Sequence, residues 1–245
     1  MQVFRSDSEG TTGLSVDLAE QVRAKPTGIA AAFAWLKDFA RRKPVAFGGG
    51  VVLVMAIFVA IFAEQIAPHA ATDIGVAGKF LGPGAEGTLL GTDQLGRDIF
   101  SRLIFGARIS MYVGIVSVLI GITFGTLVGV TSAYVGGWAD ILLQRLVDAL
   151  MGFPPIILAL GLMAALGASV NNVVIALVVI LVPGATRVIR SQALSIKELD
   201  YTLAARSIGA SSFRIIFRHM LPNVAATYIV LVTLTWASPS SWRRP

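Results

Sequence analysis

The chain has 245 residues, of which 55% are hydrophobic and only 14% charged, and its mean hydropathy is +0.76. Because a soluble domain has about 25% charged residues, this composition excludes an ordinary soluble protein and predicts a membrane protein. The sequence has no cysteine, which excludes a disulfide framework and a cysteine nucleophile, and its net charge of +6 indicates basic cytoplasmic loops rather than nucleic-acid binding.

Apolar runs of the length that crosses a bilayer, roughly 20 residues in a helix, recur along the chain. The stretch without charge over residues 149–186 is too long for one such helix, and the turn-forming GASVNN, residues 167–172, divides it. In the second run glycines recur every fourth residue, which predicts close helix packing rather than a substrate-lining role. We therefore expect an all-α membrane protein, a polytopic helical bundle with five recognisable spans over residues 45–66, 109–135, 141–166, 173–190 and 223–237.

The charges between these runs predict the orientation. Residues 64–108 hold four basic and five acidic residues, whereas residues 183–222 hold six basic and two acidic ones. Because basic loops stay inside, we expect a cytoplasmic loop over residues 191–222 and a cytoplasmic N-terminal tail over residues 1–44. The segment 67–108 is then expected on the outer side of the membrane.

The cytoplasmic loop carries the most informative pattern. Its SIKE segment, residues 195–198, has the spacing of a capping box and predicts the start of a short helix that ends at Gly209. Ser211 or Ser212 can cap a second short helix, which runs until Pro222 begins the next span. Two short helices joined at a glycine corner form a protruding elbow, residues 201–222, with one apolar side that fits a groove.

The elbow resembles the EAA signature of the inner-membrane permease subunits of bacterial ABC importers: Glu-Ala-Ala, three residues, Gly, nine residues, then Ile-x-Leu-Pro. The spacing is kept, although Leu203 stands in place of the Glu and His219 in place of the Ile. The resemblance implies that the elbow docks into a cleft of a separate ATPase subunit through Leu203, Ala204, Ala205, Arg206, Ser207, Gly209, His219, Leu221 and Pro222.

A second stretch, LLGTDQLGRDIFSRLIFGARIS at residues 89–110, is similar to the dipeptide, oligopeptide and nickel branch of these permeases, and to the second (C-type) of its two paired subunits. The resemblance covers residues 35–236 and implies the ABC importer permease fold with six spans. Within this stretch Asp93 or Thr92 can cap a helix, and Asp98 is spaced to pair with Arg102. The resemblance implies contact with a periplasmic substrate-binding protein at Asp93, Arg97, Asp98 and Arg102.

Two ionisable residues, Arg145 and Asp148, lie three positions apart at the start of the third span. The glycine and prolines that follow, residues 152–155, predict a kink in that helix. We expect a structural pair that reaches the interface, and a role in lining the cytoplasmic end of the pathway is the alternative.

The resemblance implies a permease subunit of an ATP-driven importer in the bacterial inner membrane. With a second permease the chain would form a pathway for dipeptides, oligopeptides or nickel, fed by a periplasmic or lipid-anchored substrate-binding protein. The chain itself is not expected to be an enzyme or to bind a cofactor, because its glycine-rich FGGGVVL lacks the Lys-Ser or Lys-Thr of a phosphate loop. ATP and Mg²⁺ are expected on two partner ATPase subunits.

Two other classes remain open. An ion-gradient-driven secondary transporter predicts ionisable residues near mid-membrane, and none of the five runs has one at its centre. A non-transporting membrane assembly protein is compatible with the composition. The two histidines, His69 and His219, are too few and too far apart in sequence to predict a zinc site.

The last residues, 238–245, read SPSSWRRP and differ in character from the apolar run before them. A shifted reading frame of codons for this stretch gives Ile-Leu-Ala-Glu-Ala, which resembles the continuation of the family after its fifth span. We therefore hypothesise an aberrant C-terminal end, in which a frameshift has removed the end of the fifth span, the next loop and a sixth span.

Overall fold

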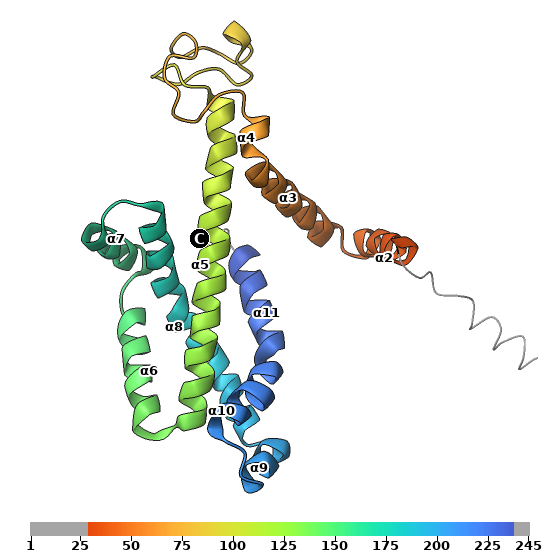
Figure 1. Cartoon of the computed structure of the whole chain (residues 1–245), viewed down its shortest axis with the longest axis vertical. Coiled ribbons are helices and arrows are strands. Elements are labelled where there is room, and N and C mark those ends of the chain that lie inside the picture. The colour runs from red at the N-terminus through yellow and green to blue at the C-terminus, as the bar shows by residue number, and fades with distance from the viewer. Residues whose placement is uncertain (1–28, 238–245) are drawn as a thin grey trace, which may run out of the picture. The chain divides into compact units, whose positions relative to one another are not determined.

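The computed structural model describes residues 29–237 (Figure 1), and the chain divides into two units at residue 58, each described here by itself. The first unit contains α2 (Ile29–Arg42) and most of α3 (Pro44–Ile61). Arg42 pairs with Asp38 one turn earlier, at 2.8 Å between Nε and Oδ2. Most of the predicted tail and all of residues 238–245 lie outside the described residues.

The second unit contains helices of very different lengths. After α4 (Ala63–Ile66), the chain runs through an irregular segment with one short 3₁₀ turn, η1 (Ala85–Gly87), into the long α5 (Ile99–Val135). The elements that follow are α6 (Gly137–Met151), α7 (Pro155–Leu166), α8 (Val170–Lys197), α9 (Asp200–Ser207), α10 (Ser212–Ile215), η2 (Ile216–Met220) and α11 (Leu221–Ala237). The predicted all-α architecture is confirmed for the described part of the chain.

Four of the described helical stretches are long and apolar enough to cross a membrane: α3, α5, α8 and residues 212–235. The pair α6 and α7 supplies a fifth if it counts as one bent span. The helices extend beyond the predicted spans: α5 begins at Ile99 rather than at residue 109, and α8 continues to Lys197 rather than ending at residue 190. The 37 residues of α5 correspond to about 55 Å at 1.5 Å per residue, well beyond a hydrocarbon core of about 30 Å.

Helices α5 and α8 pack closely along the predicted glycine stripe. A Cβ atom added to Gly125 would lie 2.7 Å from the Cβ of Ala185 and 2.9 Å from the carbonyl oxygen of Val182. A Cβ on Gly129 would lie 2.7 Å from the carbonyl oxygen of Thr186, whose hydroxyl donates a hydrogen bond of 3.2 Å to the carbonyl of Gly125. The prediction that these glycines serve helix packing is confirmed.

The largest buried apolar cluster lies where α5, α8, the elbow and α11 meet. Its members come from six elements, α5, α8, α9, α10, η2 and α11, and each exposes less than a tenth of its surface. We name this set the core cluster: Val130, Ala133, Ile189, Ala193, Ile196, Ala205, Ile215, Ile216, Met220 and Val224. In Figure 1 the elbow lies at one end of α5. The irregular segment that precedes α5, residues 67–98, lies at the other end.

The third predicted span, residues 141–166, is not one helix. Helix α6 ends at Met151, and α7 starts at Pro155 after a bend of 94°. Pro154 adopts an extended conformation (φ −55°, ψ 130°), because its own successor is also a proline and the α conformation before a proline is disfavoured. The predicted kink is therefore a complete break.

The predicted turn over residues 167–172 is confirmed in position but is shorter, because α8 already begins at Val170. Gly167 adopts a positive φ of 89°, and Ser169 caps α8 by accepting a hydrogen bond of 3.1 Å from the backbone N–H of Asn172. The side-chain amide of Asn172 donates to the carbonyls of Leu166 and Gly167 at 2.8 and 2.9 Å. One asparagine thus satisfies the carbonyls that the end of α7 leaves free.

We expect Gly125→Ala to destabilise the chain by about 1–3 kcal/mol, because the added methyl group forces α5 and α8 apart. The matched control is Gly161→Ala in α7, where an added Cβ meets no atom within 4 Å. Thermal unfolding of the purified full chain in detergent measures both variants. An equal midpoint for the two would contradict the close contact at Gly125.

Candidate functional site

The corner between α8 and the elbow differs from the sequence prediction. Residues 195–198, predicted as a capping box, are the end of α8 and its C-cap, and α9 begins at Asp200 after an extended Leu199. Helix α8 continues through this stretch because Ile196 is buried in the core cluster. The buried hydroxyl of Thr202 donates 3.0 Å to the carbonyl of Ile196 and closes the corner.

The glycine corner is confirmed. Helix α9 ends at Ser207, Gly209 takes a φ of 78°, and the hydroxyl of Ser211 accepts a hydrogen bond from the N–H of Arg214 to cap α10. The prediction that Pro222 begins the next span is confirmed in part, because α11 begins at Leu221, but the helix does not break there. Residues 212–235 are one continuous helix, in which the π-helical turn η2 carries the chain into the proline and the N–H of Leu221 donates to the carbonyl of Ile216.

A groove of about 440 Å³ opens on the elbow between α9 and the helix that follows the glycine corner. Three alanines, a tyrosine and an isoleucine line it together with two arginines and a histidine: Tyr201, Ala204, Ala205, Ile208, Ala210, Arg214, Arg218 and His219. Such a surface admits an apolar projection at its centre and acidic groups at its margin. It is therefore suited to binding another protein.

Three of the predicted docking residues, Ala204, Ala205 and His219, line this groove. Leu221 packs against the core cluster instead, and the other predicted residues are exposed without lining it: Leu203, Arg206, Ser207, Gly209 and Pro222. The signature did not identify Arg214 and Arg218. Their spacing of four residues, one helical turn beyond the glycine corner, is the signal that could have found them.

The elbow is fixed to the helices beneath it. Ala205 belongs to the core cluster and exposes 6% of its surface. The guanidinium of Arg206 lies 5.6 Å from the ring centre of Tyr134 near the end of α5, a cation–π contact. A force on the groove is therefore transmitted to α5 and α8.

The predicted pair of Arg145 and Asp148 does not form. Asp148 accepts a hydrogen bond of 2.7 Å from Arg187 of α8, and both side chains of this ion pair are about half exposed. Arg145 is exposed and has no ion-pair partner within the described residues. The prediction failed because the partner of Asp148 lies 39 residues away, on another helix.

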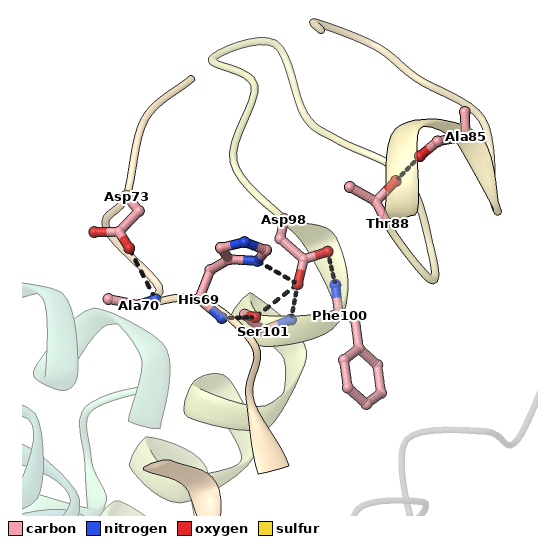
Figure 2. Close-up of polar contacts among 8 residues, drawn as sticks. All are labelled: His69, Ala70, Asp73, Ala85, Thr88, Asp98, Phe100 and Ser101. Carbon is pink, nitrogen blue, oxygen red and sulfur yellow. Dashed lines mark hydrogen bonds and ion pairs between the residues drawn. The ribbon is translucent and has the colours of Figure 1, made fainter. Parts of the chain in front are cut away.

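At the opposite end of α5, Asp98 is the N-cap (Figure 2). Its carboxylate accepts hydrogen bonds from the N–H groups of Phe100 and Ser101 and, at 2.6 Å, from the Ser101 hydroxyl, which also accepts from the N–H of His69. Burial acts to raise the pKa of Asp98, but the hydrogen bonds from Ser101 and Phe100 outweigh it and lower that pKa. The prediction that Asp93 or Thr92 caps a helix is wrong.

Asp93 organises the loop before this cap. Its carboxylate accepts hydrogen bonds from the N–H groups of Leu95 and Arg97, at 2.8 and 3.1 Å, and pairs with the side chains of Arg97 and Arg102. Asp98 therefore does not pair with Arg102, as the spacing had predicted. Asp93, Arg97 and Asp98 are held inside the 67–98 segment, and Arg102 keeps 43% of its side chain exposed.

Burial acts to raise the pKa of Asp93, but the N–H groups of Arg97 and Leu95 and the guanidinium of Arg97 lower it to about 2, from an ordinary 3.8. Because the pKa of Asp93 is lower in the folded chain than in the unfolded chain, ionised Asp93 stabilises the fold at a pH above about 4. This stabilisation is lost as the pH falls from about 4 to about 2. We expect hydrogen exchange of residues 93–102, corrected for its intrinsic pH dependence, to accelerate over that window. Asp93→Asn should exchange faster already at neutral pH, and unchanged exchange in this variant would count against the role of Asp93.

Comparison with known proteins gives the family of the chain. Residues 121–240 match the family described as "Binding-protein-dependent transport system inner membrane component". The dipeptide transport system permease protein DppC of Alkalihalophilus pseudofirmus is 38% identical over 202 residues, which are 82% of this chain and 66% of that protein. The glutathione transport system permease protein GsiD of Pectobacterium atrosepticum is 37% identical over 193 residues, 79% of this chain and 64% of that protein.

A putative peptide transport system permease protein of Brucella suis is 39% identical over 189 residues, 77% of this chain and 63% of that protein. The chain thus spans slightly less than two thirds of the length of these curated relatives. The matched region includes the glycine stripe of α5, all of α8 and the whole elbow. The chain belongs to the family of binding-protein-dependent transport system inner membrane components, the membrane permeases of ABC importers.

Proposed function

We propose that the chain is a permease subunit of an ATP-driven importer of short peptides. The observation that carries this proposal is the groove on the elbow, which is exposed to a partner and at the same time fixed to α5 and α8 through the core cluster. The relatives reported above are dipeptide, glutathione and peptide permeases, which favours peptides over nickel as the transported substrate.

The partners follow from this proposal. A second permease subunit completes the translocation pathway, two ATPase subunits bind ATP and Mg²⁺, and a periplasmic or lipid-anchored substrate-binding protein delivers the peptide. The chain resides in the bacterial inner membrane with its N-terminus in the cytoplasm. Closure of the ATPases on ATP pulls on the elbows, and the permease pair alternates between inward-open and outward-open states.

The elbow docks into a cleft of the ATPase, whose residues contact Ala204 and Ala205 in the groove and whose acidic residues pair with Arg214 and Arg218. At the other end of α5, the exposed part of Arg102 is the contact to the substrate-binding protein. Asp93, Arg97 and Asp98 support that contact by holding the loop in place. Asp148 has a structural role through Arg187.

Cysteine labelling tests the orientation. The chain has no cysteine, so Ser207→Cys in the elbow and Lys79→Cys in the 67–98 segment each introduce a single, exposed thiol. We expect a membrane-impermeant maleimide to label position 79 in intact cells, and position 207 only after the inner membrane is opened. Labelling of position 207 from outside would contradict the proposed function.

Ala204→Trp tests the docking site. Ala204 is exposed and lines the groove, so we expect the larger side chain to block the ATPase and to reduce its co-purification, and peptide uptake with it, at least about tenfold. The control is Ala70→Trp, an equally exposed position at the other end of α5. Uptake of a labelled dipeptide and of nickel, measured in parallel, identifies the substrate. Normal ATPase binding by the Ala204 variant would exclude this groove as the docking site.

A further inference from the structure

Several polar contacts attach helix α6 to α5 and α8. Within the described residues, α6 contributes no member to either buried apolar cluster, and only two of its residues, Asp140 and Val147, are buried. Asp140 lies in the first turn of α6 and forms a bidentate ion pair with Arg190 of α8. The two contacts measure 2.7 Å from Nε to Oδ1 and 2.5 Å from Nη2 to Oδ2.

The surroundings of this pair fix its geometry. The hydroxyl of Ser132 in α5 donates to the carboxylate of Asp140, and the side chain of Gln144 donates 3.1 Å to the same hydroxyl. The side chains of Asp140 and Arg190 are 12% and 28% exposed. Because a bidentate, partly buried pair has one defined geometry, it resists sliding of α6 along α8.

Arg190 is itself part of the frame that carries the elbow. Its neighbours in α8, Ile189 and Ala193, are fully buried in the core cluster that also contains Ala205 of the elbow. One turn beyond, the ammonium of Lys197 donates 3.0 Å to the carbonyl of Ala133 in α5. The backbone at Arg190 therefore moves with the elbow, and its guanidinium is a charged link from that frame to the first turn of α6.

We propose that Asp140 and Arg190 are positioning residues, which carry a displacement of the elbow to α6 and through α6 to the 94° bend before α7. This inference rests on the proposed function of the elbow. Helix α6 is joined to α7 only by the short link over residues 152–154, and none of the twelve residues of α7 is buried, so a displacement of α6 acts directly on the bend. ATP-driven movement at the groove thereby reaches the membrane-embedded bend.

A second ion pair between the same two helices provides a matched control. Arg187 and Asp148 are joined by one contact of 2.7 Å, with side chains 53% and 52% exposed. A single contact between half-exposed side chains leaves a pair more freedom than a bidentate one, so this pair constrains α6 against α8 less than Asp140 and Arg190 do. Removing this pair should leave the link between the elbow and α6 in place.

The test uses the assembled importer, with the full chain and its partner subunits in lipid vesicles, and measures peptide uptake and ATP hydrolysis separately. We expect Arg190→Gln to lower the uptake per ATP hydrolysed at least about tenfold, while ATPase binding is retained. Arg190→Lys keeps the charge without the bidentate geometry and should give an intermediate value. Arg187→Gln should stay within about twofold of the unmodified chain.

A distance measurement separates positioning from general stability. Spin labels at Trp138→Cys in α6 and Ser207→Cys in the elbow, both exposed sites, should give one narrow distance distribution that Arg190→Gln broadens and Arg187→Gln does not. Unchanged uptake per ATP in Arg190→Gln, or an equal effect of both variants, would overturn the inference. If Arg190→Gln fails to assemble with the partner subunits, Arg190→Lys is measured instead. An uptake per ATP equal to that of the unmodified chain would then overturn the inference.

The same assay separates a failure of the proposed function from a failure of the positioning role of Arg190. If the unmodified chain shows no ATP-dependent uptake with its partners, the proposed function fails. If the unmodified chain couples uptake to ATP and the Arg190 variants do so equally well, only the positioning role fails.

Discussion

The close approach of α5 and α8 is the contact on which the rest of the second unit depends. Lipid tails are as apolar as leucine, so these helices gain little from hydrophobic burial in a membrane and are held by van der Waals contact and hydrogen bonds instead. Glycines at positions 121, 125 and 129 allow that contact, and the Thr186 hydroxyl reaches the backbone of α5 through it. The core cluster is the extension of this interface toward the elbow.

Stiff and loosely attached parts of the unit are therefore distinct. Helices α5 and α8, the elbow and the start of α11 share buried apolar side chains. Helix α6 has two buried residues and is joined to this frame by ion pairs with Arg187 and Arg190 of α8, and α7 has no buried residue. The proposed transmission of movement from the elbow to the bend before α7 needs this division. A uniformly packed bundle would resist the movement, and an unattached helix would not receive it.

Local features were predictable from the sequence, and features that depend on distant partners were not. The glycine stripe, the turn at residues 167–172 and the left-handed Gly209 follow from spacing and backbone preference alone. Residues 195–198 do not form the predicted capping box but end α8, because Ile196 is buried in the core cluster. No local sequence pattern contains that information. The partners of Asp140 and Asp148 lie 50 and 39 residues away, beyond any helical spacing.

The π-helical turn η2 changes the direction in which the side chains of α11 point relative to those of α10. Hydrogen bonding from Leu221 back to Ile216 accommodates one more residue than an α-helical turn, and each residue rotates the following chain by about 100°. The faces of α11 are thus offset in phase from those of α10. The surface that the last helix presents to its neighbours can be reset by adding or losing a single residue in this turn, while Arg214 in α10 keeps its place in the groove.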